Sequence, residues 1–249
     1  MGTPQSLVTG AFVNSDSCID CSVLSVGEYF EINGDTMLVV DRTMLDSMLL
    51  EYKDMSKVCV SHVTNMKDVF RGRTQFNDDI TAWDISNVTD MTNMFFKAKS
   101  FNQDIGNWDV SKVIRMPRMF QAAKVFNQDI GSWDVGNVER FQAMFRNADA
   151  FNHDIGSWDV SSTLNRTQME RMFQSADSFS QDLSNWCVSH ITAQPVGFDA
   201  NSILTSSQLP QWGTCPPFVN VNGCVDCLAL NIGDEFVLNG DSMIVVDRP

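Results

Sequence analysis

The hydrophobic positions of this chain recur with a period of 25 residues. The stretch 101–125 reads FNQDIGNWDVSKVIRMPRMFQAAKV, edited copies begin at Phe76, Phe126 and Phe151, and a partial copy begins at Phe179. A fixed period in the twenties is typical of repeat proteins whose single units are too small to bury their own apolar face. The pattern therefore predicts an elongated stack of similar units.

The apolar residues of each repeat follow two different spacings. The first half has the spacing I-x-x-W-x-V-x-x-V, and the alternation around Trp108 and Val110 fits a short strand. The second half has apolar residues at i, i+3, i+4 and i+7, the spacing of one helix face, at Met116, Met119, Phe120 and Ala123. We therefore predict an α/β repeat solenoid that is leucine-rich-repeat-like, with one short strand and one short helix per 25-residue repeat and β-hairpin cap modules at its ends.

Stacking of such units would place equivalent side chains above one another, about 4.7–4.9 Å apart along the sheet. Aromatic side chains are expected to form the core ladder because they bury large apolar areas. The tryptophan column would comprise Trp83, Trp108, Trp133, Trp158 and Trp186, and the phenylalanine column Phe76, Phe101, Phe126, Phe151 and Phe179.

A second, longer repeat brackets the first. Residues 12–42 and 218–248 are similar, and each copy has an Asn-Gly pair between two apolar runs, which predicts a hairpin. We expect the first hairpin to lie across the open end of the stack and to cover its core. We also expect the natural chain to continue beyond Pro249.

These boundaries give the predicted domain organisation. It comprises a CxxC hairpin cap with a lead-in helix at 1–50, a solenoid at 51–203, a C-terminal cap at 204–217 and the start of a second hairpin module at 218–249. Within the solenoid the full repeats are 76–100, 101–125, 126–150 and 151–178, with partial repeats at both ends.

The repeated motif FNQDIGxWDVSxVxxMxxMF resembles the repeats of BspA-like leucine-rich-repeat bacterial surface proteins, a family with repeats of 25 or 26 residues. The resemblance covers residues 55 to about 215. It implies an extracellular or cell-surface protein that acts in adhesion or partner binding. It supplies no catalytic residues.

Composition narrows the function classes. The formal net charge of −14 and the pI near 4.4 argue against nucleic acid and anionic membrane surfaces as partners. No run of about 20 apolar residues is present, so membrane insertion by this segment is not expected. The three histidines occupy non-equivalent repeat positions and no hydrolase, phosphate-loop or metalloprotease motif appears, so we predict a protein that is not an enzyme and has no organic cofactor.

The seven cysteines suggest disulfides. Cys187 replaces the ladder aspartate in the last repeat, and a bridge to Cys215 would fasten the C-terminal cap. Cys59 takes the same ladder position in the first repeat, so its expected partner is Cys18 or Cys21. Disulfides are typical of secreted proteins. Two CxxC motifs contain Cys18, Cys21, Cys224 and Cys227. Such a motif can also act as a redox-active pair or bind zinc, but we favour a structural disulfide here.

Two aspartate columns are candidate cation ligands. Stacked carboxylates repel, and calcium would relieve that repulsion. The alternative is that each aspartate accepts backbone hydrogen bonds in a turn, and we favour this reading. The calcium candidates are Asp79, Asp104, Asp129, Asp154 and Asp182. The second column lies on the predicted strand and comprises Asp84, Asp109, Asp134 and Asp159.

The outward positions of the predicted strands form the candidate binding face. They are Asn107, Asp109, Ser111, Ser132, Asp134, Ser157, Asp159 and Ser161. We expect this face to bind a protein or polysaccharide at a cell surface. Alternatives are self-assembly with neighbouring copies into a fibre or surface layer, and calcium-dependent polysaccharide or mineral binding. The N-glycosylation pattern occurs at Asn87 and Asn165.

Overall fold

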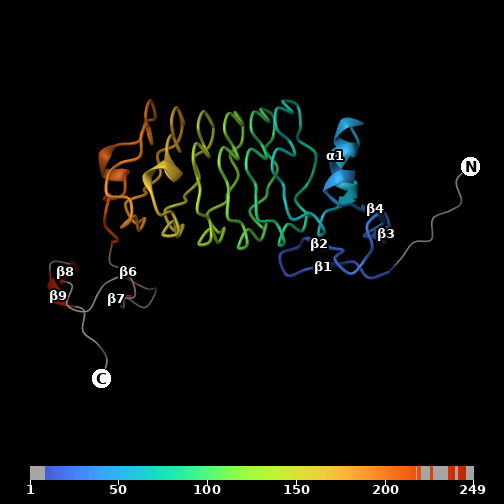
Figure 1. Cartoon of the computed structure of the whole chain (residues 1–249), viewed down its shortest axis with the longest axis horizontal. Helices are drawn as coiled ribbons and strands as arrows, with labels where there is room; N and C mark the ends of the chain where they lie inside the picture. Colours follow the sequence, from blue (N-terminus) through green and yellow to red (C-terminus); the bar gives the residue numbers. More distant parts are fainter. Residues whose placement is uncertain (1–8, 217, 220–224, 227–234, 239–240, 245–249) are drawn as a thin grey trace, which may run out of the picture.

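A computed structural model describes residues 9–216, 218–219, 225–226, 235–238 and 241–244. Its centre is a row of irregular loops that stand side by side (Figure 1). We call each loop a coil: the first is 51–75, followed by 76–100, 101–125, 126–150, 151–178 and 179–203.

The coils contain very little regular secondary structure. In the described part of the chain, the α-helix is α1 (Arg42–Leu50), and η1 (Met55–Lys57), η2 (Arg166–Met169) and η3 (Ser206–Gln208) are single 3-10 turns. Strand β5 (Val58–Cys59) is the only named strand within the described coils. The prediction of an α/β repeat solenoid, leucine-rich-repeat-like with one strand and one helix per repeat, is therefore wrong.

The predicted helix is instead a run of tight turns. The N–H groups of Met119 and Ala123 each donate to the carbonyl oxygen three residues earlier. The alternating N–H groups of Arg118, Phe120 and Ala122 instead donate to carbonyl oxygens of the next coil. A helix would direct all of these groups into its own turns. A run of turns can place apolar residues three and four positions apart on one side as a helix does, so the spacing alone did not distinguish the two.

The predicted strand is broken by turns on both sides of Val110. The N–H of Trp108 donates to the carbonyl of Ile105, and the N–H of Val113 donates to that of Val110. Pairing between coils is limited to isolated parallel bridges that link Asn65, Asp90, Arg115 and Arg140 in successive coils. The coils are thus joined mainly by scattered backbone hydrogen bonds rather than by a continuous sheet.

Aromatic columns fill the interior. All five tryptophans of the column are at most 4% exposed, and Phe101, Phe126, Phe151 and Phe179 are fully buried. The rings of Phe101 and Phe126 stack with centroids 5.9 Å apart, and those of Trp133 and Trp158 with centroids 6.5 Å apart. Phe76, the first member of its column, is only partly buried.

The N-terminal cap consists of two strand pairs and a helix. Strand β1 (Phe12–Val13) pairs with β2 (Ile19–Asp20), and β3 (Tyr29–Ile32) forms a hairpin with β4 (Asp35–Val39). The hairpin turn has positive φ at Asn33 (52°) and Gly34 (86°), as a type I′ turn requires. Strand β4 also pairs in parallel with β5, which attaches the hairpin to the first coil.

Helix α1 supplies most of the apolar cover at the open end of the aromatic core. Leu45 and Leu49 of α1 are buried in the same cluster as the coil side chains. The hairpin residues Phe30 and Met37 pack in a separate small cluster with Cys21 and Cys59. The hairpin also reaches the main cluster through Leu38 of β4, so the open end is covered by the helix and the hairpin together (Figure 1).

At the other end, the segment 195–215 makes the last contacts. The N–H of Phe173 donates to the carbonyl of Phe198, whose ring meets that of Phe173 edge-on at 74°. The stacked phenylalanines therefore end against a perpendicular ring. Trp212 packs edge-on against Phe198 in turn, at 81°.

The second hairpin module repeats the strand pairs of the first. Strand β6 (Phe218–Val219) pairs with β7 (Val225–Asp226), and β8 (Glu235–Leu238) pairs with β9 (Asp241–Ile244). Both pairs are antiparallel, as in β1–β2 and β3–β4. The predicted turn Asn239-Gly240 and the cysteines Cys224 and Cys227 lie outside the described residues.

Candidate functional site

The candidate binding face runs along one side of the coils. We call it the polar face; it comprises Asn107, Asp109, Ser111, Ser132, Asp134, Ser157, Asp159 and Ser161. The positions Ser132, Asp134, Ser157, Asp159 and Ser161 are exposed, whereas Asp109 and Ser111 are half-buried.

Each aspartate of this column accepts a backbone hydrogen bond within its own turn. The carboxylates of Asp109, Asp134 and Asp159 accept from the N–H two residues later, at 2.9–3.1 Å. Short acidic side chains stabilise turns in this way. The column therefore has a structural role in the coils, and it leaves exposed carboxylate at Asp134 and Asp159.

The calcium candidates form a parallel column with the same hydrogen bonding. Asp79, Asp104, Asp129, Asp154 and Asp182 each accept from the N–H two residues later, at 2.8–3.1 Å. The hydrogen bonds from Ser184 hold the pKa of Asp182 below its usual value. Among the described residues, no three His, Cys, Asp or Glu side chains are grouped so that they could hold a metal ion.

Hydrogen bonds between coils fix the polar face in place. The hydroxyl of Ser132 donates to the carbonyl of Gly106, and the hydroxyl of Ser157 donates to that of Gly131. An asparagine column does the same at the coil edges: Asn77, Asn102, Asn127 and Asn152 each accept the backbone N–H of the next coil. The spacing between exposed groups is therefore set by the backbone repeat.

The N-terminal cap covers one end of this side of the stack. The amide of Asn107 donates to the carbonyl of Asp16 at 2.8 Å, so Asn107 anchors the cap loop. Asp84, the equivalent of Asp109 in the preceding coil, is 4% exposed. The freely accessible part of the polar face is therefore carried by the coils after Asn107.

Two disulfides fasten the ends. Cys187 is bonded to Cys215, and Cys59 is bonded to Cys21. The sequence left Cys18 and Cys21 open as partners of Cys59, and the structure places Cys21 there. Both bridges link a cap to the neighbouring coil.

Cys18 is the unpaired cysteine among the described residues. Burial raises the pKa of its thiol to about 12, with the charge of Asp84 contributing in the same direction. A reactive thiol needs a lowered pKa and solvent access. With Cys21 in a disulfide, the first CxxC motif therefore has a structural role in this arrangement.

The remaining polar candidates are dispersed. Asn87 accepts from the Lys112 ammonium at 2.9 Å and is half-buried, whereas Asn165 is exposed and caps η2. His62 and His153 each contact a backbone carbonyl in a different part of the stack. The structure does not bring these side chains together into one site.

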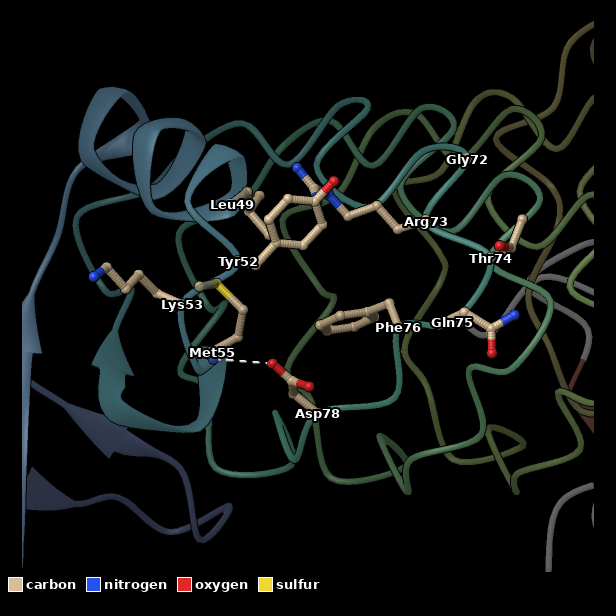
Figure 2. A pocket seen from close by; sticks show the side chains of 10 residues that line it. All are labelled: Leu49, Tyr52, Lys53, Met55, Gly72, Arg73, Thr74, Gln75, Phe76 and Asp78. Carbon is tan, nitrogen blue, oxygen red and sulfur yellow. Dashed lines mark hydrogen bonds between the residues drawn. The ribbon is translucent and has the colours of Figure 1, made fainter.

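One cavity was missed by the sequence reasoning. It has a volume of about 410 Å³ and lies between the end of α1 and the start of the second coil. Its lining includes Tyr52, Arg73, Phe76 and Asp78 (Figure 2). The sequence contains a signal for this cavity, because two residues here depart from the repeat pattern. Arg73 occupies a position at which later coils have a buried alanine, and Asp78 occupies one at which most later coils have glutamine.

No helix in the described part of the chain has the length and apolar character needed to cross a membrane.

Comparison with known proteins assigns the chain to a family. No curated protein and no solved structure shows significant similarity to this chain. A family model described as Mycoplasma protein of unknown function, DUF285, matches residues 42–158 and 105–212, which together span more than half of the sequence. The chain therefore belongs to the DUF285 family.

Proposed function

We propose that this protein is a non-catalytic extracellular or cell-surface scaffold that binds a partner protein or polysaccharide through its polar face. The observation that carries the proposal is the repetition of exposed Asp134 and Asp159, with their flanking serines, on successive coils. The hydrogen bonds between coils hold these groups in register, so a partner with its own regular spacing would meet several of them at once.

The disulfides support the extracellular part of the proposal. Such bonds persist in oxidising environments and are rare in the cytosol. The resemblance of the repeat motif to BspA-like surface proteins points in the same direction. Both caps are fastened by disulfides, which suits a protein outside the cell.

A bead-adhesion experiment tests this function. Beads coated with the protein would be applied to epithelial monolayers, and the triple variant Asp109→Asn, Asp134→Asn, Asp159→Asn would be compared with the unmodified chain. Asparagine can still accept the turn hydrogen bond, so the variant keeps the coils but removes three charges. We expect at least a fivefold loss of bound beads.

A matched control carries the same charge change away from the polar face. Glu139→Gln, Glu170→Gln and Asp177→Asn also remove three negative charges, at positions that lie outside the polar face. Equal losses for both triple variants would attribute adhesion to net charge. Full adhesion by the polar-face variant would refute the proposed role of that face.

Self-assembly is the second candidate function. The observation that favours it is the recurrence of the paired strands of the N-terminal cap in β6–β9, which places two cap modules in one chain. Small-angle scattering over a hundredfold concentration range tests it. Growth of the particle length with concentration would support assembly, whereas a constant monomer would exclude it.

A further inference from the structure

The cavity beside α1 exists because the phenylalanine column ends there. Phe101, Phe126 and Phe151 each have a ring of the same column in the coil before and in the coil after, but the position 25 residues before Phe76 is Glu51. Phe76 stacks on Phe70, with centroids 3.8 Å apart, and on Phe101, with centroids 5.9 Å apart. Phe76 is half-buried, and its side chain lines the cavity (Figure 2).

A second aromatic ring borders the same space. Tyr52 follows α1 and is 88% exposed, an unusual degree of exposure for a large aromatic residue. In Figure 2 the rings of Tyr52 and Phe76 lie on opposite sides of the opening. A planar ring placed between them would make favourable aromatic contacts with both.

Arg73 supplies a positive charge at this position. The equivalent residues in later coils are fully buried alanines: Ala98, Ala123, Ala148 and Ala176. The guanidinium of Arg73 lies 5.8 Å from the centroid of the Tyr52 ring. No carboxylate among the described residues forms an ion pair with it. Its fork of donors is suited to bind a carboxylate.

Asp78 supplies a negative charge on the other side of the cavity. In later coils the side chains at this position contact a carbonyl oxygen of the preceding coil, at Gln103, Gln128, His153 and Gln181. Asp78 instead accepts from the N–H of Met55 through Oδ2, at 3.1 Å. Its other oxygen forms no hydrogen bond within the described structure and remains available for a donor.

We propose that this cavity binds an aromatic amino acid as the zwitterion. The aromatic ring packs between Phe76 and Tyr52, the carboxylate meets Arg73 and the ammonium group meets Asp78. The volume of about 410 Å³ lies within the usual range for small-molecule sites. The Lys53 side chain also lines the cavity, but its ammonium points away from Phe76 and lies 3.5 Å from Glu51 (Figure 2). This site is independent of the polar face and of the proposed adhesive function.

Titration of the whole chain with L-phenylalanine tests the proposal. Binding would be followed by ¹H–¹⁵N correlation spectra up to 20 mM ligand, with expected shifts concentrated at the amides of residues 52–55 and 72–78. Three further ligands each remove one feature: N-acetyl-L-phenylalanine lacks the ammonium group, L-phenylalaninamide lacks the carboxylate and L-leucine lacks the ring. We expect each to bind at least fivefold more weakly.

Variants then connect each ligand group to its residue. Arg73→Gln should weaken phenylalanine binding at least fivefold but leave the weaker binding of the amide unchanged. Asp78→Asn keeps an oxygen acceptor for Met55 and should weaken phenylalanine but not its N-acetyl derivative. Arg71→Gln, which removes an exposed cation two residues from Arg73 and outside the cavity lining, is the matched control and should bind phenylalanine normally.

The same measurements can overturn the proposal. Absence of shifts at 20 mM phenylalanine would show that the cavity only reflects the junction between α1 and the first repeats. Leucine binding as tight as phenylalanine would exclude recognition of the aromatic ring. Equal binding of the N-acetyl derivative would show recognition of a peptide C-terminus instead, and equal binding of the amide would show recognition of a peptide N-terminus.

Discussion

At the scale of single residues, the stack depends on backbone conformations that most side chains avoid. Arg118, Ala122, Ala143 and Asn147 all have φ between 54° and 57°, and equivalent positions in the neighbouring coils do the same. The left-handed region costs a non-glycine residue about 1–2 kcal/mol. These residues adopt it because the turns must direct alternate N–H groups toward the next coil.

This strain gives a prediction for Ala122. Ala122→Gly should stabilise the protein by about 0.5–1 kcal/mol, because glycine adopts positive φ without steric cost and that gain exceeds its loss of chain entropy. Chemical denaturation measures the free energy of unfolding. Ala123→Gly is the control: Ala123 is fully buried and has no positive φ, so this change should destabilise by about 1 kcal/mol. Destabilisation by Ala122→Gly would contradict the turn geometry.

Close approach between coils gives a second prediction. A Cβ added to Gly131 would collide with the carbonyl oxygen of Asp154 in the next coil. Gly131→Ala should therefore destabilise by about 1–3 kcal/mol, the usual range for overpacking.

Gly136→Ala is the matched control for this change. Its added Cβ would meet the Asp134 carboxylate at 3.3 Å, a side chain that can move, so the expected cost is below about 1 kcal/mol. Both variants would be compared by thermal unfolding. Equal melting temperatures would show that the coils can separate slightly at Gly131.

At the scale of elements, the two ends of the stack differ from its middle. Helix α1 exists because apolar Leu45 and Leu49 face the core and Asp41 caps the first turn, accepting the N–H of Met44 at 2.8 Å. A lead-in helix was predicted here from its pattern, and the Asn-Gly hairpin was predicted from its turn residues. Both signals are local in sequence. How the two elements share the cover of the core depended on long-range packing: α1 contributes Leu45 and Leu49, and the hairpin contributes Leu38.

The cap of α1 can be tested directly. Asp41→Ala removes the acceptor for Met44 and should destabilise the protein by about 1 kcal/mol. Ser47→Ala changes an exposed residue of the same helix and should stay within about 0.5 kcal/mol of the unmodified chain. Denaturant titration followed by circular dichroism measures both. A neutral Asp41→Ala would mean that α1 is held by its buried leucines alone.

At the scale of the whole molecule, each coil contacts mainly its neighbours. Asn102 accepts the N–H of Asn127, and Asn127 accepts that of Asn152, so one coil can substitute for another in the hydrogen-bonding scheme. Stability in such arrays is approximately a sum over units and their interfaces. Both disulfides lie outside the three central coils.

Deletion of a whole unit should therefore be tolerated. Removing residues 126–150 would place Asn152 above Asn102 and keep every column in register, so we expect a folded protein with a melting temperature lowered by several degrees. Removing only residues 126–137 would shift the columns and should abolish cooperative unfolding. Scanning calorimetry distinguishes the two deletions. Loss of cooperativity in both would show that the coils are not interchangeable.

The sequence by itself determined the repeat, its 25-residue period and the columns of buried aromatic residues, because these follow from which side chains recur and must leave water. The hairpin turn and the lead-in helix were also determined locally. Only the tertiary structure decided that the second half of each repeat forms turns rather than a helix. The hydrophobic spacing fits both conformations, and the choice depends on whether the N–H groups bond within one unit or to the next. The cavity beside α1 was decided in the same way, because Phe76, Arg73 and Asp78 come together only where the first repeats meet the end of the helix.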